Sequence, residues 1–191
     1  MNTLLNTLHT RHSIPASLLE EPAPNEQQLN DILRCAITAP DHAKLRPWRF
    51  IVIKNDARYA LANVFTNAAK IREPTISEQQ LTRLKEKPLR SPLIVVIVAT
   101  LTTNHPKVPE IEQVLSAGAA VQLIQLGATA LGFGSIWLTG NNAFDENVKK
   151  SLEVEEKDQI VGFLYMGTPP KEVPIRHRAD IADHVSEWTG L

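Results

Sequence analysis

The stretch Glu110–Leu131, EIEQVLSAGAAVQLIQLGATAL, predicts the element around which the fold is built. Its length and apolar content indicate one long helix, and Gly132 and Gly134 mark its end because glycine readily adopts a positive φ. Mostly small residues fill positions 117–120 and 127–130, where another backbone can approach closely. Because few polar side chains remain to face water, we expect a central helix that is enclosed on most of its sides.

The run Leu93–Thr100, LIVVIVAT, predicts a strand buried on both faces, because it is continuous and rich in β-branched residues. Asn25 and Gln28 resemble a capping box at the start of an apolar helix. The other predicted strands lie at 48–53, 135–138 and 159–166, and the predicted helices at 2–10, 25–37, 56–70, 77–85 and 144–152. Interspersed strands and helices are typical of an α/β or α+β protein whose helices cover a sheet.

Composition limits the classes of protein to consider. The 191 residues show no break in composition, which predicts a single domain over residues 1–191. A net charge of −1 gives no overall attraction for nucleic acid or for an anionic membrane. The first residues lack the order of a signal peptide, and no apolar stretch reads as a membrane span. The lone Cys35, expected to be a buried structural thiol, cannot form an internal disulfide. We therefore expect a cytoplasmic protein without nucleic-acid or membrane partners.

Arg11-His12-Ser13 follows the first predicted helix and is a candidate anion site. Arginine offers a planar fork of donors and serine a hydroxyl, which together suit a phosphate or a ribityl chain. Arg176-His177-Arg178 could hold a phosphate in the same way. A solvated helix end and a solvated charge pair are the simpler interpretations of the two segments taken alone.

Two further segments could line a ligand site. Residues 39–50, APDHAKLRPWRF, form a basic loop that enters a strand, and such loops often bind ligands. Residues 134–140, GSIWLTG, place Trp137 and Thr139 on one face of a short strand, where a flat aromatic cofactor could pack. A surface loop anchored by Trp48 and an ordinary core strand explain the two segments equally well.

Other chemistries are not indicated by the sequence. The six histidines show no metal-ligand spacing, and there is no G-x-S-x-G nucleophile motif. Gly132-Phe133-Gly134 comes after a helix and before a strand, which is the reverse of the dinucleotide-binding order. We expect no metal site and no catalytic acid, base or nucleophile supplied by the protein.

Taken in order, these segments resemble the nitroreductase family of FMN-dependent oxidoreductases, and most of all its short YdjA-like members. Arg11-His12-Ser13 resembles the N-terminal flavin motif, and residues 39–50 resemble the second motif. The helix from Glu110 into the turn at 132–137 resembles the long central helix, and KDQIVGFLYMGT at 157–168 resembles the late strand. The resemblance implies an α+β fold with a central, mostly antiparallel sheet wrapped by helices. It also implies a homodimer with exchanged termini and FMN at the interface.

The resemblance assigns residues to the site as well. The positions that match FMN contacts are Arg11, His12, Ser13, Thr38, His42, Trp137, Leu138, Thr139 and Arg178. The first three and Arg178 would hold the ribityl phosphate, with Arg176 as a weaker candidate, and residues 137–139 would line the ring. His42 would reach the flavin from the facing subunit, and Thr38 stands where relatives often place a basic residue. The positions that match nicotinamide nucleotide contacts are Gly127, Ala128, Thr129, Ala130, Leu131 and Gly132.

The implied reaction is a two-step hydride transfer from NAD(P)H through FMN to a nitroaromatic, a quinone or a similar flat acceptor. Related proteins of this fold carry out reductive dehalogenation, flavin fragmentation or enone reduction. A flavin carrier or redox sensor without turnover is the alternative outside the enzymes.

Two features depart from the family pattern or qualify it. Many members carry a Lys or Arg shortly after the first motif, near the pyrimidine edge of the flavin, whereas residues 14–17 here read IPAS. A charge at that place would have to come from elsewhere, and Arg46 and Arg49 are the candidates. The polar insert Lys54–Arg90 is short, which indicates an open and unselective site.

Overall fold

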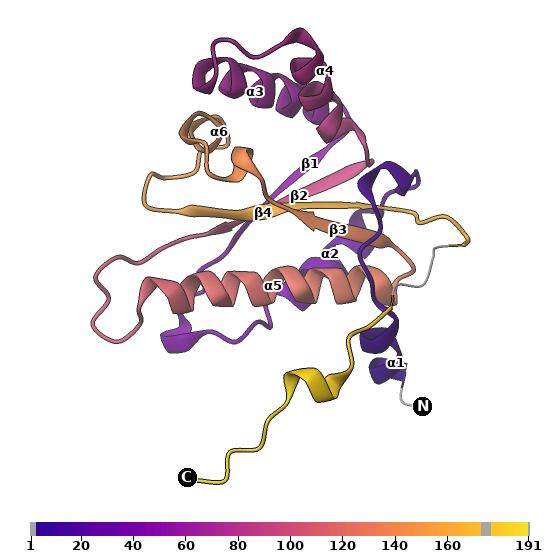
Figure 1. Cartoon of the computed structure of the whole chain (residues 1–191), viewed down its shortest axis with the longest axis vertical. Helices are drawn as coiled ribbons and strands as arrows, with labels where there is room; N and C mark the ends of the chain where they lie inside the picture. The colour runs from indigo at the N-terminus through magenta and orange to yellow at the C-terminus, as the bar shows by residue number, and fades with distance from the viewer. Residues whose placement is uncertain (1–2, 173–176, 191) are drawn as a thin grey trace.

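A computed structural model describes residues 3–172 and 177–190 and shows an α+β protein with one antiparallel sheet (Figure 1). The strand order is β1-β2-β4-β3. The strands are β1 (Arg49–Lys54), β2 (Leu93–Ala99), β3 (Gly134–Leu138) and β4 (Gln159–Gly167). The helices are α1 (Thr3–Thr10), α2 (Glu26–Ala36), α3 (Ala57–Arg72), α4 (Glu78–Glu86), α5 (Glu110–Ala130) and α6 (Glu146–Ser151). Short 3₁₀ turns are η1 (Ala16–Leu18), η2 (His42–Lys44), η3 (Lys87–Leu89), η4 (Asn141–Ala143) and η5 (Ile181–His184).

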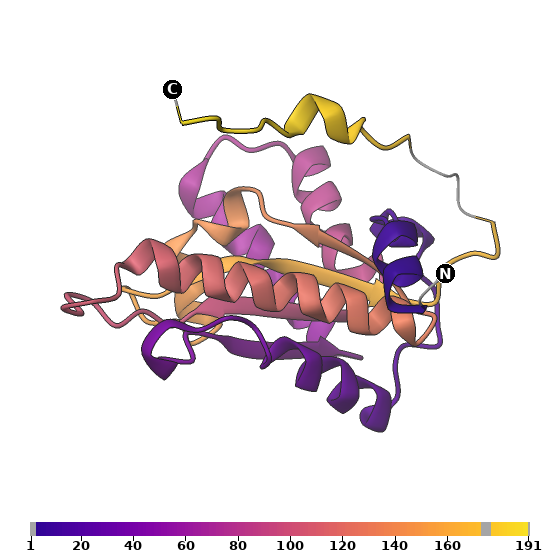
Figure 2. The ribbon, with the colours of Figure 1, turned by 90° about the horizontal axis from the view of Figure 1, so that it is seen from below.

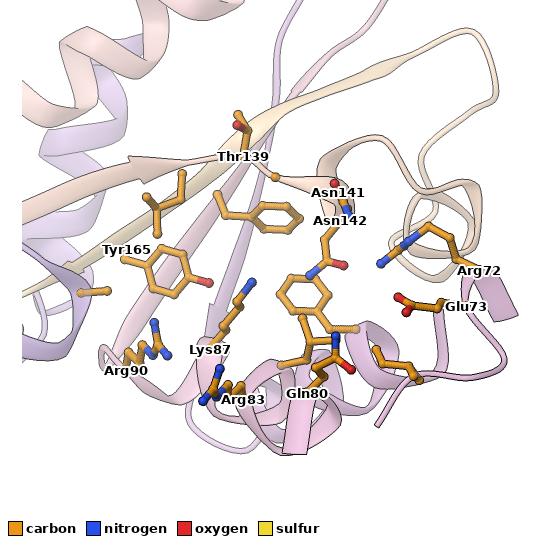
Figure 3. Close-up of a pocket in the computed structure, with 17 residues that line it drawn as sticks. Arg72, Glu73, Gln80, Arg83, Lys87, Arg90, Thr139, Asn141, Asn142 and Tyr165 are labelled. Atoms are coloured by element: carbon orange, nitrogen blue, oxygen red, sulfur yellow. The ribbon is translucent and has the colours of Figure 1, made fainter. Parts of the chain in front are cut away.

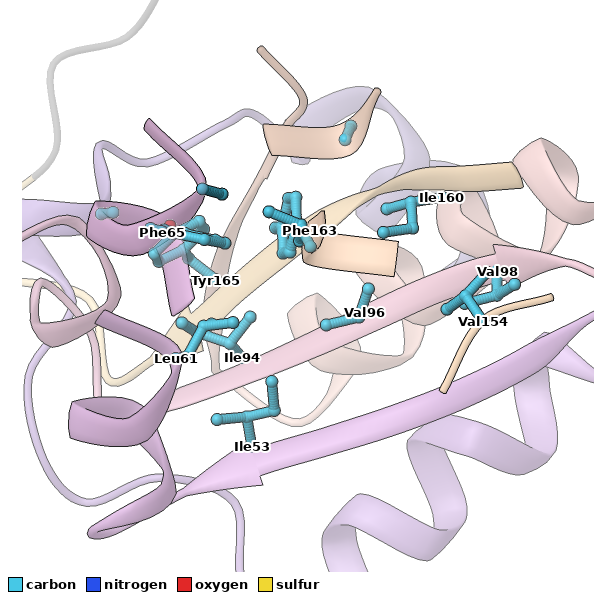
Figure 4. Close-up of a cluster of buried hydrophobic side chains, with 14 of the residues drawn as sticks. Ile53, Leu61, Phe65, Ile94, Val96, Val98, Val154, Ile160, Phe163 and Tyr165 are labelled. Atoms are coloured by element: carbon cyan, nitrogen blue, oxygen red, sulfur yellow. The ribbon is translucent and has the colours of Figure 1, made fainter. Parts of the chain in front are cut away.

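The sheet lies between two helical layers, and the central strand β2 is buried along its whole length. Helices α2 and α5 cover one face, while α3, α4 and α6 lie over the other (Figure 1). Figure 4 shows the core beneath α3, where the rings of Phe65 and Phe163 meet edge to face with centroids 5.2 Å apart. The prediction that Leu93–Thr100 is buried on both faces is therefore confirmed, since each side of β2 faces a helical layer.

Helix α5 packs closely on α2 because Gly127 lacks a side chain. A Cβ added there would lie 3.2 Å from the Sγ of Cys35 and 3.4 Å from the Cα of Ile32. The prediction that Cys35 is a buried thiol holds only in part, since its side chain is half-buried in the described chain. The prediction of an enclosed α5 holds on the sheet side, whereas Ile111 and Leu115 remain 62% and 64% exposed.

The predicted capping box is confirmed at the start of α2. The Asn25 side chain accepts a hydrogen bond from the Gln28 amide, and the Gln28 side chain accepts one from the Asn25 amide. This reciprocal pair satisfies two backbone donors that the first helical turn leaves free. The capping box fixes the residue at which α2 begins.

Strand β3 forms one edge of the sheet, and the chain that follows α1 runs beside it. The amide of Ile14 donates to the carbonyl of Ser135 at 3.1 Å, and Glu20 forms a β-bridge with Thr168. Gly134 makes this approach possible, because an added Cβ would lie 2.7 Å from the Cδ1 of Ile14. The N-terminal motif is thereby held against the first residues of β3.

The C-terminal segment 177–190 extends away from the sheet (Figures 1 and 2). Its apolar side chains are exposed. Trp188 is 85% exposed, and Ile181 and Val185 are also largely exposed. The predicted extended segment 173–176, which includes Arg176, lies outside the described residues. Within the described part of the chain, no helix has the length and apolar content of a membrane span.

Candidate functional site

Two arginines from opposite ends of the chain meet beside the start of β3. The guanidinium of Arg178 donates a hydrogen bond to the backbone carbonyl of Arg11, which follows α1. Burial, and then the positive charge of Arg178, lower the pKa of Arg11 below its ordinary value. In the described chain neither arginine forms an ion pair with a carboxylate. Two neighbouring cations without a counter-charge are a suitable binding site for an anion such as a phosphate.

His12 and Ser13 lie next to Arg11 in sequence and add further hydrogen-bonding groups. The Nδ1 of His12 lies 2.9 Å from the carbonyl oxygen of Thr10, so we assign the ring proton to Nδ1. The Nε2 of His12 is buried and has no hydrogen-bond partner within residues 3–172 and 177–190. A buried acceptor of this kind is costly unless a donor reaches it, and a ligand hydroxyl would be such a donor.

A cavity of about 710 Å³ opens beside the other end of β3, between the sheet and the α3–α4 layer (Figure 3). Its floor includes the rings of Phe163 and Tyr165 on β4, and one wall is formed by the end of β3. The side chains that line it are Ala16, Phe65, Arg72, Glu73, Ile76, Gln80, Arg83, Leu84, Lys87, Arg90, Leu138, Thr139, Asn141, Asn142, Phe163 and Tyr165. Burial raises the pKa of Tyr165 to about 12, and the nearby charge of Arg90 opposes this shift without cancelling it. The Tyr165 hydroxyl therefore stays protonated at neutral pH and can donate a hydrogen bond.

Four cations line this cavity, and they differ in their partners. Arg72 forms an ion pair with the buried carboxylate of Asp145, which also caps α6. Arg83, Lys87 and Arg90 form no ion pair with any carboxylate that the structure describes. Figure 3 shows these three at one end of the cavity with Tyr165, and Arg72 with Glu73 at the other. Sequence reasoning missed this set, although the i, i+4, i+7 spacing of the three was the available signal.

The structure separates Trp137 from Thr139, which the sequence analysis placed on one face. Trp137 is opposite Leu164 on the α5 side of the sheet, whereas Leu138 is opposite Phe163 on the cavity side. Strand β3 ends at Leu138, so the alternation stops and Thr139 lines the cavity with it. The indole of Trp137 donates to the carbonyl of Val161 at 3.1 Å. Of the predicted ring contacts, Leu138 and Thr139 thus line the cavity and Trp137 does not.

His42 lies far from the arginine pair within one subunit. Its Nδ1 lies 2.8 Å from a carboxylate oxygen of Glu112 at the start of α5. The arginine pair lies near the other end of this helix, and Glu112 and Ala130 are about 27 Å apart along its axis. His42 is therefore too far from the arginine pair to join it within one chain. Thr38, also predicted, lies exposed after α2, and its hydroxyl donates to the carbonyl of Cys35 at 2.8 Å.

The predicted nicotinamide segment, Gly127–Gly132, is the end of α5 and its turn. Gly127 and Ala128 are buried against the rest of the subunit, while residues 130–132 are exposed. Gly132 has a φ of 84° and closes the helix. Packing and helix termination account for the glycines of this segment, and only its exposed end could touch a nucleotide.

Of the two arginines suggested for the pyrimidine edge, Arg49 has its guanidinium engaged within the described chain, whereas Arg46 is held through its backbone amide. The guanidinium of Arg49 donates to the carbonyl of Leu152 at 2.8 Å, and the amide of Arg46 donates to Asp41. Neither residue lines the cavity beside β3. Among residues 3–172 and 177–190, no group of three or more His, Cys, Asp or Glu side chains is arranged to hold a metal ion.

The chain is similar in sequence and in fold to proteins of one family. The model of the nitroreductase family matches residues 8–168. YdjA of Escherichia coli (strain K12), whose name proposes an NAD(P)H nitroreductase, is 42% identical over 81% of this chain and 82% of its own length. A nitroreductase-like protein of Bacillus cereus superposes with a TM-score of 0.83 at 20% identity, covering 100% of this chain and 98% of its own. A proposed nitroreductase of Desulfovibrio desulfuricans, solved in complex with FMN, has a TM-score of 0.75 at 21% identity and 98% coverage of both chains.

Proposed function

This chain belongs to the nitroreductase family, and from that premise we propose that it is an FMN-dependent oxidoreductase. It would take hydride from NAD(P)H and reduce a flat, electron-poor acceptor such as a nitroaromatic or a quinone. Relatives named for NAD(P)H nitroreductase activity and a structural neighbour solved with FMN support this proposal. The observation that carries it is the arrangement of ligand-binding groups along β3.

Strand β3 connects two places that suit the two ends of FMN. The unpaired cations of Arg11 and Arg178 lie near its first residues, and the cavity lies beside its last. Ser135 and Thr139 are about 13 Å apart in an extended chain, a span that suits a phosphate at one end and a ring at the other. The buried, unpartnered Nε2 of His12 lies at the phosphate end, where a ribityl hydroxyl would satisfy it.

Each residue then has a defined task. Arg11 and Arg178 hold the phosphate by charge-assisted hydrogen bonds, and His12 and Ser13 orient the ribityl chain. Leu138 and Thr139 line the ring and exclude water from one of its sides. FMN held by these residues would supply the redox chemistry of the site. The protein needs no acid, base or nucleophile of its own for this reaction.

We propose further that two subunits form each site. The distance between His42 and the arginine pair, the exposed Ile111 and Leu115 on α5, and the exposed tail support this arrangement. Ala120, at first sight a good position to disrupt such an interface, lies fully buried in the core of its own subunit. Leu115→Glu is the better variant, because its side chain is exposed in one subunit.

Light scattering on the purified protein tests the dimer. We expect the native protein to be dimeric at micromolar concentration and Leu115→Glu to be monomeric with weakened FMN binding. Ile71→Glu is the matched control, since Ile71 is as exposed as Leu115 but lies on α3 in the opposite layer. A stable monomer loaded with flavin would refute the shared site.

The flavin assignment is tested by releasing the cofactor with heat and comparing it with standards by chromatography. We expect FMN and not FAD, because one arginine pair suits one terminal phosphate. Anaerobic addition of NADPH should bleach the flavin absorbance, and a nitroaromatic or quinone should restore it. A holoprotein that binds FMN but is not reduced by NADH or NADPH would favour a flavin carrier or sensor.

A further inference from the structure

The three unpaired cations on the α4–η3 segment have no task in the proposed flavin site. Arg83, Lys87 and Arg90 follow one another at i, i+4 and i+7, so they project from one side of this helical segment. We call them the cationic rim. All three side chains are solvent-exposed at the edge of the cavity, so they can contact a molecule that enters it.

The charge at this end of the cavity is uncompensated. The carboxylate of Asp145 neutralises Arg72, and Glu73, the one carboxylate among the described residues that line the cavity, lies at the end away from the rim (Figure 3). A cleft lined by charges of one sign concentrates oppositely charged solutes at its mouth. The rim therefore favours entry of an anion over entry of a neutral molecule of the same shape.

The rest of the cavity suits a planar molecule. Phe163 and Tyr165 provide aromatic rings at the floor, and the protonated Tyr165 hydroxyl is a hydrogen-bond donor. A volume of about 710 Å³ is within the usual range of small-molecule sites. An aromatic body over the floor would leave its anionic substituent at the rim.

We propose that the cationic rim selects planar electron acceptors that carry a carboxylate, such as nitro-substituted aromatic acids, over their neutral counterparts. This inference rests on the proposed function, because Leu138 and Thr139 line both the ring site and the cavity. In the reaction NAD(P)H gives up a hydride and solvent gives one proton. The nitro group loses one oxygen as water and becomes a nitroso group, and the carboxylate is unchanged. Selection of this kind differs from the open and unselective site that the short insert predicts, and the experiment below distinguishes the two.

The test compares 4-nitrobenzoate with its neutral counterpart 4-nitrobenzamide as acceptors for the holoenzyme. We expect kcat/KM to favour the acid by roughly five- to twentyfold at low salt, from three exposed charge contacts of ordinary strength. The preference should decline as salt is added, because exposed charges are screened. In the triple variant Arg83→Gln, Lys87→Gln, Arg90→Gln the preference should disappear while the amide is reduced as before. Lys85→Gln is the matched control, since Lys85 is an exposed cation on α4 that does not line the cavity.

Binding without turnover separates this inference from the proposed function. Benzoate cannot be reduced, so the difference between its affinities for the native holoprotein and for the triple variant, measured by calorimetry, reports on the rim apart from turnover. If NADPH is oxidised with a neutral quinone but acid and amide react equally, the rim does not select and this inference is wrong. If no acceptor is reduced but benzoate binds and the triple variant loses it, the proposed function fails and the anion site stands. Two further results would also overturn the inference. One is that the triple variant uses the acid and the amide less well and binds FMN less tightly, all by the same factor. The other is that the triple variant changes only the KM for NADPH, which would assign the rim to the nucleotide phosphates.

Discussion

The two ends of strand β3 are built on opposite principles. At its start, Arg11 and Arg178 come together from the two ends of the chain, and burial lowers the pKa of Arg11. At its end, the cationic rim lies on one helical segment in contact with water, above a floor of buried aromatic rings. The first arrangement suits a ligand that is held permanently, because Arg11 is partly desolvated. The second suits a ligand that enters and leaves, because exposed charges attract without binding tightly.

The largest effect that we expect comes from adding a methyl group at the ring end. In Gly162→Ala the new Cβ would lie 2.1 Å from the Nε1 of Trp137 and 2.9 Å from the carbonyl oxygen of Leu138. Overpacking of this severity should lower the free energy of unfolding by about 3 kcal/mol, measured by urea denaturation. Because the end of β3 must shift, FMN and riboflavin should lose affinity in parallel. The double variant with Trp137→Leu should lose less stability than the sum of the single variants, and strict additivity would contradict the clash.

Removing Arg11 should weaken binding of the FMN phosphate without changing binding of the flavin ring. Arg11→Ala deletes a charge-assisted contact worth roughly 1.5–3 kcal/mol, so FMN affinity should fall on the order of tenfold to a hundredfold. Riboflavin has no phosphate, and its affinity should hardly change. Arg11→Lys should recover only part of the loss, since an ammonium lacks the planar fork. Fluorescence titration of the apoprotein with both ligands gives the answer, and equal weakening of the two would mean that Arg11 acts through the fold.

The pH dependence of stability should reveal the buried phenol beneath the rim. The pKa of Tyr165 is raised to about 12 in the folded chain, above its ordinary value near 10 in the unfolded chain. The protonated form is therefore favoured by folding, so this contribution is present below pH 10 and is lost as the pH rises toward 12. Over that range the native protein should lose roughly 1–3 kcal/mol more than Tyr165→Phe, measured by urea denaturation at each pH. Parallel curves for the two proteins would place the hydroxyl in solvent.

The smallest effect should come from the rim itself when the ligand is FMN. The triple variant of Arg83, Lys87 and Arg90 should change FMN affinity by less than about threefold, because the phosphate site that we propose is at the opposite end of β3. The same titration that detects Arg11→Ala detects this difference. A tenfold loss of FMN affinity in the triple variant would contradict the proposed difference in role between the two ends of β3.

Much of the fold could be predicted from local patterns. The continuous apolar run of β2 and the capping box of α2 depend on neighbours in sequence, and both are confirmed. The predicted enclosure of α5 holds only on its sheet side, because Ile111 and Leu115 are exposed. Cys35 was harder to predict, because its exposure depends on how closely Gly127 lets α2 and α5 approach. The side of the sheet on which Thr139 lies could not be predicted from alternation, because strand β3 ends one residue before it.

The candidate site was predictable only in part, for the same reason. Arg11, His12 and Ser13 are adjacent in sequence, so a motif could indicate them, and the structure brings Arg178 to them. The rim residues are spaced along a polar helix that resembles any solvated surface, and only the tertiary structure places them over Tyr165. Whether His42 meets a flavin depends on a second subunit and stays a prediction.

The contact between Arg178 and Arg11 joins residues that are 167 positions apart in sequence, and it has a consequence for the lifetime of the protein. If FMN bridges the two guanidiniums, it also fixes the start of the tail 177–190, which is otherwise exposed throughout. Ligands that bind only the folded form stabilise it by mass action, and loose termini are where proteases cut first. Trypsin should therefore remove the tail from apoprotein faster than from holoprotein, and riboflavin should protect it poorly. In a cell that lacks riboflavin, protein molecules without FMN would be degraded faster, because proteases could cut their exposed C-terminal segment.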